Sequence, residues 1–434
     1  MSEPIIFSPD ESSIRGELRV LKISVLLMIV YAALHYAAFF RLLGVPGLPP
    51  ILLLTYRIMD MVIVVAFLVY CGRWVKIRGI DLLLLVFAIY PFLIGLARGN
   101  ISVTFGNDTA IFFSFIAKII IFRTILYRIS AVVDIDTIFQ KSARKIVFWC
   151  ALIALLSLCT AIVMLGRGTN FYYQAPAELT FAAALLLAQG KIFAYLFFLA
   201  LALAAGKRMI MIGLLVMAMI AAVANPKTRR ATLRFSVVAL LLAPLAIIFS
   251  GALFNTELIF IDKILVTFRQ LSRSMEMSDN FFETLMFLAP DRYVEYVSLK
   301  PYLTGWSLWF GNGYGFRYDL DVVFLAEFGY ADGAEVTNAH FTPLAITAKF
   351  GLVGLLIWVV LIATVLTSRF NRRSYVQYAC RLAFLSMIVQ SFFAFGFFIN
   401  LFTPFYIAMA SVGVRRAASP QDLPVIEKQQ RGYT

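Results

Sequence analysis

Charged residues are scarce in this chain, and cysteine and histidine are scarcer still. Only 14% of the 434 residues are charged and 62% are hydrophobic, whereas a soluble domain is about a quarter charged. The four cysteines lie in or beside apolar runs and share no polar loop, which disfavours disulfides and CxxC metal sites. We therefore expect an integral membrane protein, organised by apolar runs long enough to cross a bilayer.

Acidic residues are also in the minority, with 24 Asp and Glu against 38 Lys and Arg. A net charge of +14 would suit a nucleic-acid partner, but no stacking motif or basic low-complexity arm accompanies it, so none is expected. The cations cluster in short loops between apolar runs, as the positive-inside rule predicts for cytoplasmic loops. The chain has no HExxH motif, paired histidines or Cys/His cluster, so we expect neither a metal nor a cofactor.

About twelve apolar runs have the length that a membrane-spanning helix requires. The runs on either side of Gly190-Lys191 form two spans or one long broken helix. Two spans place the basic loops, for example those around Arg144 and Arg229, on one side together with both termini, so we favour two. The predicted spans lie near 20–40, 51–70, 80–97, 109–127, 146–166, 177–190, 192–206, 209–224, 233–254, 342–367, 381–399 and 401–414.

The predicted fold is an all-α polytopic membrane protein of about twelve transmembrane helices, with both termini inside. One large loop on the outer face separates spans 9 and 10, and it is too long for a linker. Its aromatic residues and its glycine turn, Gly311-Asn312-Gly313-Tyr314-Gly315, lead us to expect short helices packed over the membrane domain. The segments are a cytoplasmic tail (1–19), spans 1–9 (20–254), the large loop (255–341), spans 10–12 (342–414) and a second cytoplasmic tail (415–434).

Polar residues on the outer face are the candidates for chemistry. His340 is one of two histidines and lies where the large loop meets a span. An imidazole there can serve as an acid or a base near neutral pH, although a lone histidine is more often a satisfied hydrogen-bonding group. Lys207-Arg208 interrupts an apolar stretch and either snorkels to lipid headgroups or holds an anion, since the guanidinium fork suits phosphate oxygens.

Other polar motifs have simpler interpretations. Arg292 and Arg317 are each either solvated ion-pair partners or ligands of the same anion, and the candidate partners of Arg292 are Asp291 and Glu295. Asp134-Ile135-Asp136 resembles the metal-binding DxD of soluble nucleotide-sugar transferases, but no domain surrounds it and we assign it no metal. The glycine turn at 311–315 has no following Lys-Ser/Thr, so it is a turn rather than a phosphate loop.

The order of these motifs resembles that of the O-antigen ligase and polysaccharide polymerase superfamily. The ligase pattern of that family is His, then Asn, Ser or Gln, then nine residues, then Gly-x-x-Gly. Here His340 and Gly351-Leu352-Val353-Gly354 keep that spacing, and Phe341 replaces the small polar residue.

Two further stretches extend the resemblance to about residues 200–354. Residues 292–316, with Pro301 and the glycine turn, are similar to the family's outer-loop run of Arg, Trp, Pro and a glycine-rich turn. Gly206-Lys207-Arg208 is similar to its short arginine-containing motif at a middle span.

The resemblance implies a glycosyltransferase of the bacterial inner membrane whose active site faces the periplasm. Its donor would be a glycan on undecaprenyl pyrophosphate. The acceptor would be a second lipid-linked unit, for a polymerase of O-antigen or exopolysaccharide, or lipid A–core, for an O-antigen ligase. Phe341 favours the polymerase slightly. A chain-length co-polymerase is a further expected partner.

Roles for individual residues follow from the same resemblance. His340 would act as the base, and Arg208 and Arg292, with Lys207, would stabilise the pyrophosphate leaving group. Asn338 and Arg317 would bind substrate. The span count also fits a lipid-linked oligosaccharide flippase or a non-catalytic scaffold subunit. Polar groups gathered at one membrane edge, rather than at the midplane, disfavour a transporter.

Overall fold

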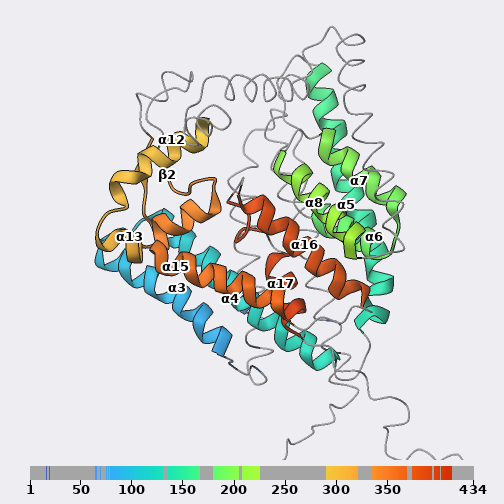
Figure 1. Ribbon diagram of the computed structural model, residues 1–434, viewed down its shortest axis with the longest axis horizontal. Coiled ribbons are helices and arrows are strands. Elements are labelled where there is room, and N and C mark those ends of the chain that lie inside the picture. Colours follow the sequence, from blue (N-terminus) through green and yellow to red (C-terminus); the bar gives the residue numbers. More distant parts are fainter. Residues whose placement is uncertain are drawn as a thin grey trace, which may run out of the picture.

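A computed structural model describes residues 79–130, 135–166, 179–204, 208–224, 290–320, 335–368, 374–392, 395–400 and 402–412, with a few isolated positions before residue 79. These residues are 81% helical. Within them, α3 (Gly79–Ala97), α4 (Val103–Ser130) and α15 (Thr342–Thr367) are long and apolar enough to cross a membrane. The chain therefore has the character of a helical membrane protein (Figure 1).

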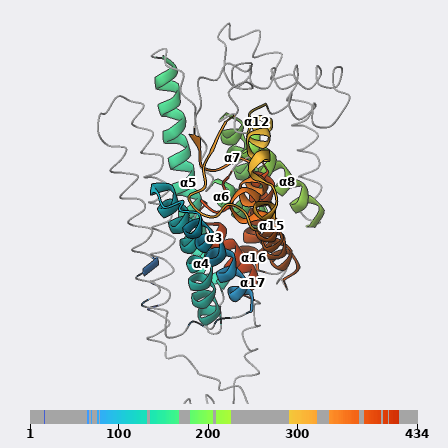
Figure 2. The same ribbon diagram turned by 90° about the vertical axis from the view of Figure 1, so that its left-hand side faces the viewer.

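The helices form two groups joined by α16 and α17 (Figures 1 and 2). In the first group α3 packs against α4 and α15, and in the second α6, α7 and α8 pack against one another, with α5 beside α6 and α7. Helix α16 lies against α6 and α8, and α17 lies against α4. The remaining bounds are α5 (Ile135–Gly166), α6 (Leu179–Ala188), α7 (Ile192–Ala204), α8 (Arg208–Ala224), α16 (Tyr375–Ser391) and α17 (Thr403–Ser411).

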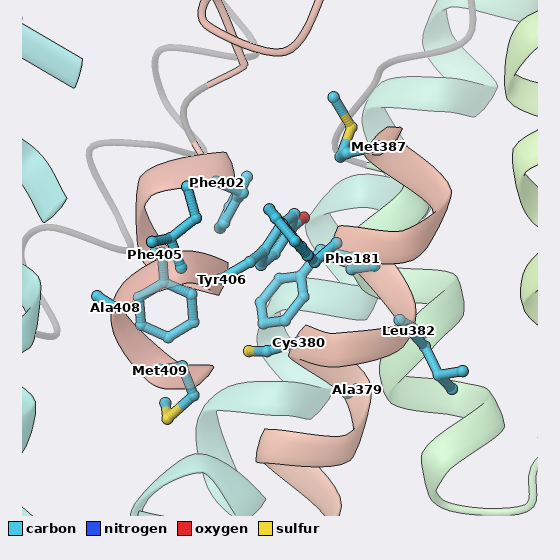
Figure 3. Packing of buried hydrophobic residues seen from close by; sticks show 14 of the residues in the cluster. Phe181, Ala379, Cys380, Leu382, Met387, Phe402, Phe405, Tyr406, Ala408 and Met409 are labelled. Carbon is cyan, nitrogen blue, oxygen red and sulfur yellow. The ribbon is translucent and has the colours of Figure 1, made fainter. Parts of the chain in front are cut away.

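Aromatic rings fill the contacts between these helices. Phe87 of α3 stacks on Phe350 of α15 with centroids 4.4 Å apart, and Phe112 of α4 meets Phe350 edge-on at 4.7 Å. Figure 3 shows Phe181 of α6 beside Phe405 and Tyr406 of α17, where ring centroids lie 5.8 and 5.4 Å apart. Aromatic pairs at these separations add attraction beyond the area that they bury.

A break at Gly190 separates α6 from α7, and both are apolar helices shorter than the candidate membrane spans. Gly190 has a φ of 72°, its N–H donates to Leu187 O, and the N–H of Lys191 donates to Leu186 O at 2.9 Å. This Schellman arrangement ends α6, and α7 then packs back against it.

Several boundaries differ from those predicted. Helix α5 begins at Ile135, well before the predicted start at 146, and α16 runs from Tyr375 to Ser391 where 381–399 was predicted. Residues 395–399 form turns, and α17 has nine residues where 401–414 was predicted. The start of α16 is decided by capping rather than by hydropathy. Ser374 accepts the N–H of Gln377, and Asp136 accepts the N–H of Val376.

The described part of the large loop is built from short elements. They are α12 (Pro290–Leu299), a 3₁₀ turn (Lys300–Tyr302), α13 (Trp306–Phe310), β1 (Tyr318–Asp319) and β2 (Glu335–Val336). The strands pair antiparallel, with Tyr318 opposite Val336, so the all-α prediction is wrong at this point. The predicted spans 20–40 and 233–254, most of 51–70, residues 255–289 and most of both tails lie outside the described residues.

Candidate active site

His340 meets a buried carboxylate that the sequence pattern did not place in a site. Its Nδ1 contacts Glu295 Oε1, and its backbone N–H donates to Glu295 Oε2 at 3.0 Å. The His340 side chain is 61% exposed, whereas that of Glu295 is 5% exposed. The buried carboxylate thus contacts both the imidazole and the backbone N–H of His340, while most of the ring stays exposed.

Helix α12 positions this carboxylate. Val294, Glu295, Ser298 and Leu299 are buried, whereas Arg292 is half-buried and Lys300 exposed, so one face of the helix turns inward. Arg292 lies three residues before Glu295 on this helix, and its Nη1 is 3.8 Å from Glu295 Oε1. Of the two predicted ion-pair partners of Arg292, the structure shows this contact with Glu295, and the contact joins Arg292 to the His340–Glu295 pair.

The contact with Glu295 gives the two ring nitrogens of His340 different hydrogen-bonding roles. When Nδ1–H donates to the carboxylate, Nε2 carries the lone pair that can accept a proton from a hydroxyl group. The carboxylate also stabilises the imidazolium that results. An acid–base pair of this form is the arrangement that activates a hydroxyl nucleophile.

Two further polar side chains belong to the surroundings of His340 and Glu295: Tyr318, which interacts electrostatically with Glu295, and Asn338, two residues before His340. The Tyr318 hydroxyl and Asn338 Oδ1 are buried and have no hydrogen-bond partner within the part of the chain that the structure describes. Burial raises the pKa of Tyr318, and the nearby charge of Glu295 raises it further, while Arg292 opposes this. Tyr318 is therefore a neutral hydroxyl in the electrostatic field of the Glu295–Arg292 pair.

The other predicted site residues are placed differently. Arg317 Nη1 lies 2.8 Å from Glu335 Oε2 at the strand pair, away from the contact between His340 and Glu295. Lys207 lies outside the described residues. Arg208 is the first residue of α8, and only its backbone is described.

Helix α8 packs against α16, and the residue that follows α16 contacts the residue that follows His340. A Cβ at Gly213, in the second turn of α8, would lie 2.5 Å from Ser386 Oγ, close to the C-terminal end of α16. Phe392, directly after α16, contacts Phe341 with ring centroids 5.9 Å apart. Helix α16 thus links the first turns of α8 to the residue that follows His340.

The glycine turn at 311–315 is a joint between the loop and the membrane helices. Asn312 and Gly313 donate their N–H groups to Ala348 O and Lys349 O, both at 2.9 Å. Gly311 has a φ of 76°, and a Cβ there would lie 2.3 Å from the carbonyl oxygen of Lys349. Gly351 kinks α15 with a φ of 66°, and its Cβ would meet Trp309 at the same distance. The first glycine of the Gly-x-x-Gly pattern is therefore needed for close backbone packing.

A buried ion pair beneath this turn is a feature that the sequence analysis missed. Lys349 Nζ lies 2.7 and 2.6 Å from the two Asp108 oxygens, and Gly315 N–H donates to Asp108 Oδ2. The available signal was a lysine in the apolar run 342–367, because an ionisable residue inside a span requires a partner.

Carboxylates among the described residues take part in protein contacts such as helix capping. No group of three or more His, Cys, Asp or Glu side chains lies together in this described part of the chain. The carboxylate of Asp136, from the DxD-like stretch, accepts Ser374 Oγ–H at 2.8 Å and caps α16.

Comparisons with protein-family models, curated proteins and solved structures find no match to this chain.

Proposed function

We propose that this protein is a membrane glycosyltransferase that moves a glycan from undecaprenyl pyrophosphate to a sugar hydroxyl, with His340 as the base. The observation that carries the proposal is the contact between the exposed His340 imidazole and the buried Glu295 carboxylate. A base oriented by a carboxylate contributes roughly 10²–10⁴-fold to a hydroxyl-transfer rate. In this proposal the site lies on the periplasmic face of the bacterial inner membrane.

The proposed reaction is a single displacement. The acceptor oxygen forms a bond to the anomeric carbon as the bond from that carbon to the pyrophosphate oxygen breaks. His340 Nε2 takes the hydroxyl proton, and the electron pair of the broken bond leaves with undecaprenyl pyrophosphate. Attack opposite the leaving group inverts the anomeric centre.

In this proposal, cationic side chains stabilise the negative charge that develops on the pyrophosphate leaving group. Arg292 is half-buried beside Glu295, and its planar guanidinium has the fork of donors that suits phosphate oxygens. Arg208, with Lys207, would supply further positive charge from the start of α8. Charge stabilisation by one such donor is worth about 10²–10³ in rate.

The acceptor in this proposal is a second lipid-linked repeat unit, so that the product is a surface polysaccharide such as O-antigen or exopolysaccharide. Phe341 supports this choice weakly, because the ligase pattern has a small polar residue there. Its ring packs against Phe392 and offers no hydrogen bond to an acceptor sugar.

A reconstituted assay tests the proposal. Purified protein receives lipid-linked donor with either a second lipid-linked unit or lipid A–core as acceptor, and the anomeric configuration of the product is determined. We expect polymer from the wild type and a fall of about 10²–10⁴-fold in His340→Ala. The control is His35→Ala, which changes the other histidine of the chain.

Each outcome of this assay has a definite meaning. Transfer to lipid A–core alone would replace the polymerase by an O-antigen ligase with the same donor. Full activity in His340→Ala, in protein that purifies like the wild type, would refute the role of His340. Movement of the lipid-linked glycan across vesicles without any transfer would make the protein a flippase.

A further inference from the structure

The short helix α13 presents aromatic side chains at the surface of the molecule. Trp306 is 78% exposed and Trp309 is 56% exposed, and Tyr302 and Phe310 beside them are also exposed. Large apolar side chains that gather on a surface mark a site of contact with another phase or molecule. We refer to these four residues as the aromatic patch.

The aromatic patch is held at a defined level of the membrane helices. Gly311, directly after α13, packs on the backbone of α15 at Lys349 and Phe350, and Gly313 packs on Gly95 in the last turn of α3. Arg98, just past α3, donates to Asn312 and to Ser307 Oγ, the latter at 2.9 Å. Figure 1 shows α13 at the edge of the molecule, beside α3 and α15.

An apolar stripe on α3 leads up to this level. The exposed large side chains of α3 recur at helical spacing and end one residue before its C-terminus, and they are Leu82, Val86, Ile89, Leu93 and Leu96. Such a stripe on a predominantly apolar helix, whose one acidic residue, Asp81, is buried, faces lipid chains. The patch lies at the level where this stripe ends, because Gly313 packs on Gly95 in the last turn of α3.

From this placement we propose that the aromatic patch is an interfacial anchor that inserts among the lipid headgroups and glycerol backbones. Trp and Tyr are enriched at that depth because their rings are apolar and their N–H and O–H groups reach polar partners. Lys300 and Arg98 are exposed nearby, and both residue types serve as interfacial anchors. The anchor sets the depth of the loop, and it does not depend on the proposed enzymatic function.

A glycan-binding platform is the less favoured use of these rings. Trp306 already stacks on Phe310 with centroids 5.5 Å apart and an interplanar angle of 24°, so one face of each ring is covered. A sugar ring stacks on an open aromatic face, whereas insertion into lipid requires only that the exposed edges and faces of the aromatic patch meet the headgroup region.

Tryptophan quenching in vesicles tests the anchor. The full chain and its Trp306→Phe/Trp309→Phe variant are reconstituted in phosphatidylcholine–phosphatidylglycerol vesicles brominated either near the headgroup or near the acyl methyl end. The difference between the two emissions isolates the two indoles of the patch. We expect severalfold stronger quenching by the shallow bromines than by the deep ones, and weak quenching by iodide from the water.

Controls separate the anchor from its alternatives. Trp358, 4% exposed within α15, gives a matched buried reference through Trp358→Phe and should resist iodide. Quenching of the patch by iodide but by neither bromolipid would overturn the anchor, as would protection from iodide by a soluble oligosaccharide in detergent. If the double variant fails to fold, Trp306→Phe and Trp309→Phe report each indole separately.

Discussion

Lys349 of α15 and Asp108 of α4 form an ion pair that is buried among the apolar helices. Lys349 Nζ reaches both carboxylate oxygens at 2.7 and 2.6 Å, and the same carboxylate accepts the N–H of Gly315. Both side chains are 2% exposed. One carboxylate therefore ties together α4, α15 and the glycine turn of the loop, and it does so where water is excluded.

Removing one member of this pair should destabilise the protein strongly. Lys349→Met leaves the Asp108 charge buried without its cation, which typically costs about 3–5 kcal/mol. Thermal unfolding in detergent measures the effect. Asp108→Asn/Lys349→Met removes both charges and keeps an acceptor for Gly315, so it should be more stable than Lys349→Met. A double variant no more stable than the single one would contradict this account.

An exposed ion pair provides the matched control. Arg317→Met breaks the 2.8 Å contact with Glu335, where both side chains are at least one-third exposed. Water and salt screen such a pair, so the expected cost is only about 0–1 kcal/mol.

Glu295→Gln should slow the proposed reaction without weakening donor binding. Glutamine can still accept the backbone N–H of His340, but it lacks the charge that stabilises the imidazolium. We expect kcat to fall by about 10²–10⁴-fold while KM for the lipid-linked donor is unchanged. Glu335→Gln changes an exposed carboxylate and should retain the wild-type kcat. An equal loss in both variants would argue against a positioning role for Glu295.

Gly351→Ala should disrupt the joint between α13 and α15. A Cβ at Gly351 would lie 2.3 Å from the Trp309 carbonyl oxygen, in a backbone with a φ of 66°. Gly99→Ala is the control, because its φ is similar, at 71°, and a Cβ there meets nothing within 4 Å. We expect Gly99→Ala to lose about 1 kcal/mol from backbone strain and Gly351→Ala to lose clearly more stability. Equal unfolding temperatures would show that the joint tolerates the added atom.

Tyr318→Phe should improve stability at alkaline pH. Because burial and Glu295 raise the pKa of Tyr318 in the folded state, the folded protein holds this proton more tightly than the unfolded chain. Stability from this group is complete below about pH 10, the ordinary tyrosine value, and falls as the pH rises beyond it. The unfolding temperature of Tyr318→Phe should therefore decline less than that of the wild type between neutral and strongly alkaline pH. A parallel decline would show that Tyr318 does not titrate in this way.

The long helices are predictable because each is specified locally. The predicted span 342–367 coincides with α15, and 80–97 and 209–224 fall within one residue of α3 and α8. Continuous apolar runs of this length can satisfy their backbone groups in a bilayer only as helices. The start of α16 was missed because Asp136, from a distant part of the chain, caps this helix. The start of α5 was also missed, because its first turns are less apolar than the predicted span.

His340 could be selected from the sequence because histidine is rare and its position at a loop–span boundary is visible. Its partner Glu295 could not, because 45 residues separate them and any of several loop carboxylates would have suited the pattern equally. The strand pair of Tyr318 and Val336 was missed because a two-residue strand leaves almost no hydrophobic periodicity in the sequence.

The sequence by itself determined that this chain has the character of a helical membrane protein, that a break at Gly190-Lys191 divides one apolar stretch, and that His340 lies where the large loop meets an apolar run. Hydropathy, turn-forming residues and the rarity of histidine can each be read from the sequence without knowing which distant segments come into contact. Only the tertiary structure decided that Glu295 holds His340, that Lys349 needs Asp108, and that α13 lies level with the end of α3. Charges in an apolar interior act over a few ångströms, so their meaning depends on which distant segments packing brings together.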